Sequence, residues 1–174
     1  LFRGEKAMLL ARYPNIPEGG SVLWPEHFNA DYADRRSTDL RQIGIIEDAE
    51  MDMPDGYWDG GKVSIEAALN WFNVTATIES YTKGVLNLVD HDFATNAHYD
   101  EGPGDPYFIF DHINALDTEE EFYYDRENKK MYFYSSVDPN TLEMGARSAK
   151  YLMDLSGQSY INVIGLSMRG APPV

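Results

Sequence analysis

The 174-residue chain contains no cysteine, which excludes disulfide bonds and thiolate metal sites. This absence does not assign a compartment, because many secreted bacterial proteins lack disulfides. The chain also lacks an apolar run of the roughly 18 residues that a membrane helix requires, so we expect no membrane span. Its first residues, LFRGEKAMLLARYPN, lack the basic and then apolar organisation of a signal peptide.

Basic residues are scarce, since 14 Lys and Arg stand against 29 Asp and Glu and give a formal charge of -15. A surface with this balance repels a phosphate backbone, so we expect no nucleic-acid partner. The hydrophobic content of 43% is typical of a globular protein. The length favours one compact domain spanning residues 1–174.

Several catalytic signatures are missing. The sequence has neither a Gly-x-Ser-x-Gly motif nor a glycine-rich phosphate loop, which disfavours serine-based and nucleotide chemistry. Its histidines are dispersed without a His-x-x-x-His pair, which disfavours a zinc site. These histidines are His27, His91, His98 and His112. We expect His112 to serve packing or a hydrogen bond.

Aromatic residues are abundant, and the stretch EEFYYDRENKKMYFYS predicts a β-hairpin with strands at 122–125 and 131–134. Alternating apolar residues predict further strands around Val63 and Ile65, around Val74 and Ile78, and after a turn at Gly84. The segment IEAALNWF fits a strand or a short helix, and so does YFIFDHINAL. Residues 47–56 and 90–106 read as loops.

Short apolar segments separated by polar turns end the chain, in SAKYLMDLSGQSYINVIGLSMRGA. Such segments are typical of stacked β-coils. The fold class we expect is therefore mostly β, as an antiparallel sandwich or barrel-like domain with a β-helix-like C-terminal coil.

Six strings occur in the order seen in a known group of proteins: LARYPN, YWDGGKVSI followed by Trp71, GVLNL, PYFIFDHINALD, FYYDRENKKMYFYS and MDLSGQSYINVIGLSMRGA. The chain resembles a β-rich subdomain that interrupts the first coils of bacterial right-handed parallel β-helix proteins, a group including glycoside hydrolases and polysaccharide lyases. This resemblance implies an extracellular or periplasmic fragment or insertion of a larger protein. It also implies that the catalytic acids lie in later coils.

One position departs from that group, where Gly-Glu-Trp precedes the hairpin tyrosines. This chain has Glu120, Glu121 and Phe122 there. The aromatic side chain keeps a packing role at this place, and the resemblance assigns no inherited function to a carboxylate there.

Aromatic residues in or beside loops are the candidate ligand contacts, because flat rings on a rigid sheet suit the apolar face of a sugar. These residues are Trp24, Tyr57, Trp58 and Trp71. The alternative for YWDGG is that the tryptophan covers the end of the β-core, while its glycines allow close backbone approach.

Carboxylates supply two further hypotheses. Asp90 and Asp92 are the candidate catalytic acids, because alternate strand residues lie roughly 7 Å apart on one face. A calcium ion is the only cofactor considered, since loop carboxylates offer hard oxygen ligands. Its candidate ligands are Asp90, Asp92, Asp100, Glu101 and Asp105. For both groups the alternative is a solvated turn, and no EF-hand spacing is present.

These observations favour an accessory, glycan-binding domain of a polysaccharide-processing β-helix protein. The expected partners are a polysaccharide or oligosaccharide and the remainder of that protein. Two alternatives stay open, namely a part of the catalytic unit and a purely structural insertion that caps the solenoid. We do not expect the chain alone to be a complete enzyme.

Overall fold

The computed structural model describes residues 1–17, 28–34, 44–66, 72–90, 102–146 and 151–166. Within these ranges it contains fourteen β-strands, two 3-10 helices and no α-helix. The prediction of a mostly β fold with antiparallel sheets is therefore confirmed. None of the helices in these ranges has the length and apolar character needed to cross a membrane.

The largest sheet has eight strands, and every neighbouring pair in it is antiparallel. Its strands are β4 (Arg12–Tyr13), β5 (Phe28–Asn29), β6 (Tyr32–Asp34), β7 (Gly44–Glu47), β8 (Lys62–Glu66), β9 (Phe72–Thr82), β10 (Val85–Val89) and β11 (Pro106–Phe110). Their spatial order is β4-β11-β8-β9-β10-β7-β6, with β5 also paired to β11. The β9–β10 hairpin, which turns at Gly84, follows the sequence pattern. The PYFIF segment, for which the sequence allows a strand or a short helix, is the strand β11.

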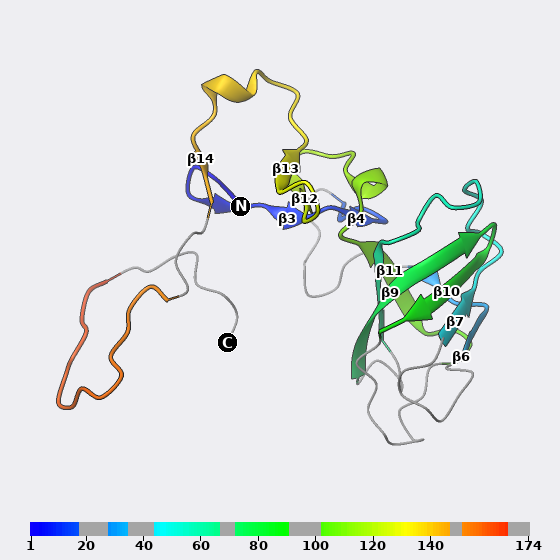
Figure 1. Cartoon of the computed structure of the whole chain (residues 1–174), viewed down its shortest axis with the longest axis horizontal. Helices are drawn as coiled ribbons and strands as arrows, with labels where there is room; N and C mark the ends of the chain where they lie inside the picture. The colour runs from blue at the N-terminus through cyan, green and yellow to red at the C-terminus, as the bar shows by residue number, and fades with distance from the viewer. Residues whose placement is uncertain (18–27, 35–43, 67–71, 91–101, 147–150, 167–174) are drawn as a thin grey trace.

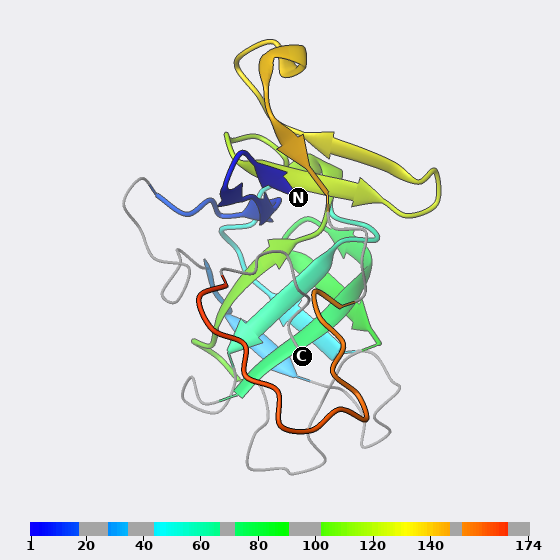
Figure 2. The same ribbon diagram turned by 90° about the vertical axis from the view of Figure 1, so that its left-hand side faces the viewer.

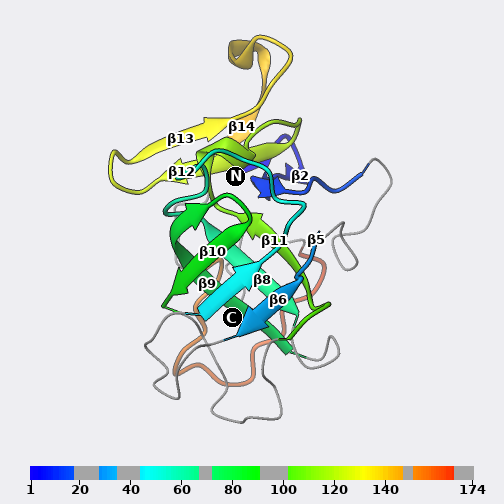
Figure 3. The same ribbon diagram turned by 90° about the vertical axis from the view of Figure 1, so that its right-hand side faces the viewer.

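The short segment 28–34 closes this sheet into a barrel. At its start β5 pairs with β11, and Ala30 N donates to Asp105 O at 3.1 Å. At its end β6 pairs with β7, and Asp31 N donates to Glu47 O at 2.8 Å. Since β11 and β7 are the two ends of the ribbon β11-β8-β9-β10-β7, one segment joins both of its edges (Figures 2 and 3).

Alternate side chains of the barrel strands fill one buried core. The inward-facing residues of its central strands are Val63, Ile65, Val74, Ala76, Ile78, Leu86 and Leu88. The pairing of β9 with β10 contains a register shift between Asn87 and Leu88, because Asn87 pairs with Ser80 whereas Leu88 pairs with Ile78. The additional residue of β9 at this bulge reverses the alternation, so that Tyr81 also points inward.

Two three-stranded sheets lie beside the barrel (Figure 1). One contains β1 (Phe2–Arg3), β2 (Lys6–Ala7) and β14 (Met144–Gly145), and the other contains β3 (Leu9–Leu10), β12 (Glu121–Asp125) and β13 (Lys130–Phe133). The 3-10 helices are η2 (Ile113–Ala115) and η3 (Pro139–Thr141). The predicted aromatic hairpin is β12–β13, in which Phe122 pairs with Phe133 and Tyr123 with Tyr132.

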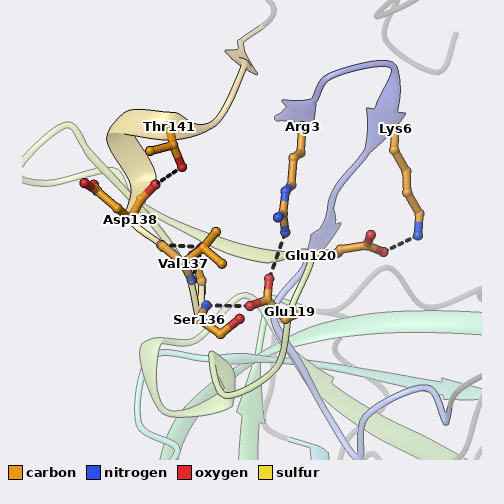
Figure 4. Close-up of polar contacts among 9 residues, drawn as sticks. Arg3, Lys6, Glu119, Glu120, Ser136, Val137, Asp138 and Thr141 are labelled. Carbon is orange, nitrogen blue, oxygen red and sulfur yellow. Dashed lines mark hydrogen bonds and ion pairs between the residues drawn. The ribbon is translucent and has the colours of Figure 1, made fainter.

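Ionic contacts fasten the N-terminal hairpin to the residues just before β12. Arg3 lies 2.9 Å from Glu119, and Lys6 pairs with Glu120 (Figure 4). Glu119 also accepts a hydrogen bond from the Ser136 amide. Glu120 has a φ of +69°, a left-handed conformation that glycine adopts more easily.

Residues 151–166, called here the C-terminal segment, contain no β-strand in the structure. The segment lies apart from both the barrel and the small sheets (Figure 1). Nine of its large apolar side chains are 39–105% exposed. The β-helix-like coil expected at this place is thus not seen in these residues.

Candidate functional site

Residues 9–13 form a strand that passes from one sheet to another. Leu9 N donates to Glu120 O at 2.9 Å and Ala11 N donates to Phe122 O at 2.8 Å, which places this part beside β12. Immediately afterwards Asp111 N donates to Ala11 O at 2.9 Å, and β4 pairs with β11 of the barrel. We call the place where the chain leaves β12 and joins β11 the crossover.

The side chain of Glu121 accepts a hydrogen bond from a backbone amide at the crossover. Its side chain is only 2% exposed, and its Oε1 accepts a hydrogen bond from Arg12 N at 3.2 Å. The backbone of β12 does not reach the Arg12 amide, because the chain turns away from β12 at this point. The Glu121 carboxyl accepts the hydrogen bond from this amide instead. The second oxygen, Oε2, is buried without a hydrogen-bond partner.

The environment of Glu121 disfavours its ionised form. Burial raises the pKa of its carboxyl to about 7, and the charge of Asp117 acts in the same direction. The amides of Arg12 and Asp117 and the charge of Arg12 only partly oppose this increase. At neutral pH the carboxyl is therefore divided between its two protonation states.

The Arg12 side chain does not form a short ion pair with Glu121, and its guanidinium lies over Phe108 at 4.0 Å from the ring centroid. Its Nε donates to Pro14 O at 2.9 Å. Burial lowers the pKa of the guanidinium, and the charge of Glu121 opposes the decrease. This arrangement explains why Arg12 compensates the Glu121 charge weakly.

Asp111 is a second buried carboxylate at the crossover. Its Oδ2 lies 2.8 Å from Arg126 in the β12–β13 turn and 3.9 Å from Lys62 on β8. Its Oδ1 is buried without a partner, and its φ is +56°, an uncommon conformation for a residue other than glycine. Through these two contacts, Asp111 connects the aromatic hairpin to the barrel.

An aromatic cluster lies next to Asp111 and includes Trp58. The Trp58 ring is 0% exposed and contacts Tyr13 at 5.4 Å, Tyr57 at 4.8 Å and His112 at 5.7 Å between ring centroids. A ring with no exposed surface offers no face to a sugar, so we withdraw Trp58 as a ligand contact. The alternative role, a cover for the end of the core, agrees with this placement.

Of the other predicted ligand and catalytic residues, the structure describes Tyr57 and Asp90. Tyr57 is half-buried against Trp58. Asp90 is exposed at the end of β10 with a φ of +53°. Trp24, Trp71 and Asp92 lie outside the described residues.

The candidate calcium ligands are not brought together in the described part of the chain. Asp105 closes a turn, because its Oδ2 accepts from Gly102 N at 2.8 Å, and burial raises the pKa of its carboxyl. Asp100 and Glu101, like Asp92, are outside the described residues. Among the residues that are described, no three acidic or histidine side chains form a group suited to a metal ion.

Sequence reasoning missed Glu121, Asp111 and Arg12 as a buried group. Charged residues are rarely buried, and nothing in the local pattern distinguishes these from surface charges. The carboxyl groups of Glu121 and Asp111 are buried, and their contacts suit joining the β13-β12-β3 sheet to the barrel. Contact with an external substrate would require the group to open.

Comparisons with protein-family models, with curated proteins and with solved structures found no match to this chain.

Proposed function

We propose that the chain is a non-catalytic accessory domain of a polysaccharide-processing protein of the parallel β-helix type, and that the C-terminal segment docks onto the solenoid of that protein. The observation that carries this proposal is the exposure of nine large apolar side chains within sixteen residues. They are Tyr151, Leu152, Met153, Leu155, Tyr160, Ile161, Val163, Ile164 and Leu166.

The energetics support a docking role for the C-terminal segment. Burying one large apolar side chain contributes roughly 1.5–3 kcal/mol, so nine of them exposed to water are a strong driving force for association. Asp154 is the only charged residue of the segment, although the whole chain carries -15. Short apolar stretches with polar turns also suit addition to the end of a β-solenoid, where they would become strands.

The proposal is tested with the triple variant Ile161→Ser, Ile164→Ser and Leu166→Ser. In the isolated chain we expect it to reduce binding of a hydrophobic dye and self-association, measured by light scattering after size exclusion, with an unchanged melting temperature. In the proposed parent protein, the amides of 151–166 should exchange at least about tenfold more slowly than in the isolated chain. The double variant Ser156→Ala and Gln158→Ala is the matched control.

Two outcomes would contradict docking. If the triple variant lowered the melting temperature of the isolated chain by several degrees, the segment would belong to the core of this domain. Equal exchange rates in the isolated chain and the parent protein would show that nothing covers it.

Glycan binding is a second candidate function, favoured by the outer aromatic residues of the hairpin. Tyr132 and Tyr134 are 40% and 42% exposed, and Tyr132 stacks on Tyr123 with centroids 6.3 Å apart and an interplanar angle of 25°. Rings held in this way can contact the apolar face of a sugar with little loss of side-chain entropy. This platform differs from the loop tryptophans that the sequence favoured.

Affinity gels containing plant and algal polysaccharides test this second function. We expect at least one polysaccharide to retard the wild-type chain and Tyr132→Ala to abolish the retardation, whereas Tyr151→Ala, a change at another exposed tyrosine, leaves it intact. Equal migration of wild type and Tyr132→Ala in every gel would exclude the hairpin as the binding surface.

A further inference from the structure

The crossover is the place where the β13-β12-β3 sheet is joined to the barrel through a shared strand. On one side Leu9 and Ala11 donate to β12, and on the other side Arg12 and Tyr13 pair with β11. Between them, the Glu121 side chain accepts from the Arg12 amide. The state of this one carboxyl therefore affects how the strand is held between two sheets.

The neighbours of Glu121 compensate a negative charge poorly. Arg12 of β4 is the cation that acts on it, but its guanidinium lies over Phe108. Asp117, from the loop before β12, carries a charge of the same sign. The paired residues of β3 are Leu9 and Leu10, which do not titrate. Just after β13, the backbone amide of Tyr134 donates to Glu121 O.

We propose that the crossover is a pH-dependent contact between the two sheets, in which neutral Glu121 holds the β13-β12-β3 sheet on the barrel and ionisation of Glu121 as the pH rises to neutral loosens it. An ionised carboxylate that is 2% exposed, with one oxygen lacking a partner, is costly to keep buried. Local opening would hydrate that oxygen and remove the cost. The inference does not depend on the docking or the glycan hypothesis.

The sign of the pH dependence follows from proton linkage. The pKa of Glu121 is raised from 4.5 to about 7 in the folded chain, so the folded state binds more protons than the unfolded state between these values. Stability contributed by Glu121 is therefore fully present below pH 4.5 and is lost as the pH rises to about 7. Above that pH no further loss arises from this group.

The decisive experiment is a ¹⁵N NMR titration of the full chain from pH 5.5 to 8.5. We expect the Arg12 amide, which donates to Glu121, to shift with a midpoint near pH 7 in the wild type and to remain constant in Glu121→Gln. Glu120→Gln, a change at the neighbouring carboxylate that pairs with Lys6, should leave the titration intact. These wild-type spectra give a result even if Glu121→Gln does not fold.

Loosening itself is measured by hydrogen exchange of the amides of Leu9, Ala11 and Arg12, corrected for the intrinsic effect of pH. Protection should fall at least about tenfold between pH 5.5 and 8.5 in the wild type and remain constant in Glu121→Gln. A flat Arg12 titration in the wild type, or an equal loss of protection in Glu121→Gln, would overturn the proposal.

Discussion

Trp58 lies at the end of the barrel core, where Tyr13, Tyr57 and His112 contact its ring. Gly61 lies close to this ring, and a Cβ added at Gly61 would be tight, at 3.2 Å from both Trp58 O and the Cβ of His112. Of the two glycines of YWDGG, Gly61 therefore allows the backbone to lie close to the residues after β11, whereas Gly60 has open space around its Cβ position. A loop sequence with a large ring and two glycines thus contributes to the core.

Replacing Trp58 with alanine should lower the free energy of unfolding by about 3–5 kcal/mol, because the change removes a fully buried ring and leaves a cavity. Urea denaturation followed by far-UV circular dichroism measures this loss. Trp58→Phe keeps an aromatic ring and should cost less than half as much. A loss below about 1 kcal/mol for Trp58→Ala would show that the ring does not support the core.

At the scale of single residues, the sequence identifies chemistry but not burial. It predicts a packing or hydrogen-bonding role for His112, and the structure places His112 against Trp58 with its Nδ1 accepting from Asn114 N at 3.2 Å. It contains no indication that Asp111 has a left-handed backbone or that Glu121 is enclosed. Both features depend on strands that are distant in the sequence.

The sequence predicts the strands more completely than it predicts the burial of single residues. Alternation of apolar residues predicts β8, β9 and β10, and the aromatic runs predict β12 and β13. The bulge in β9 is not predictable in this way, since it appears only when the pairing of Leu88 with Ile78 is known. Segment 28–34 is also missed, because its two short strands depend on partners from opposite ends of the ribbon.

The β9–β10 turn gives a prediction at the scale of an element. Gly84 has a φ of +80°, and a Cβ added there would lie 3.1 Å from Asp48 O, so Gly84→Ala combines backbone strain with a backbone clash. We expect a loss of about 2–3 kcal/mol in the free energy of unfolding, measured by urea denaturation.

Two other glycines allow the effect of the backbone strain to be measured separately from that of the steric clash. Gly104 has a φ of +86° but open space around its Cβ position, so Gly104→Ala should show the backbone strain alone, about 1 kcal/mol. Gly102 has neither feature, and its alanine variant should be nearly neutral. Equal losses for Gly84→Ala and Gly104→Ala would show that the contact with Asp48 O adds nothing.

At the scale of the whole molecule, the closed barrel and the uncovered C-terminal segment contrast in their apolar residues. The barrel encloses its large apolar side chains in one core, whereas the segment leaves nine of them exposed. The composition of the chain is a single average and does not distinguish the two regions. The sequence therefore predicts a globular protein with a β-rich core, but the arrangement in space shows which part of the chain is left to contact another surface.

The strand at residues 9–13 has a consequence for where the chain can be divided. Leu9 and Leu10 belong to a small sheet and Arg12 and Tyr13 belong to the barrel, with only Ala11 between them. A truncation from the N-terminus that extends beyond Ala11 would therefore remove strands from both sheets. A deletion of one residue within 9–13 would change the register of two sheets at once. The small sheet and the barrel therefore share one continuous stretch of chain, and a change in its length affects both.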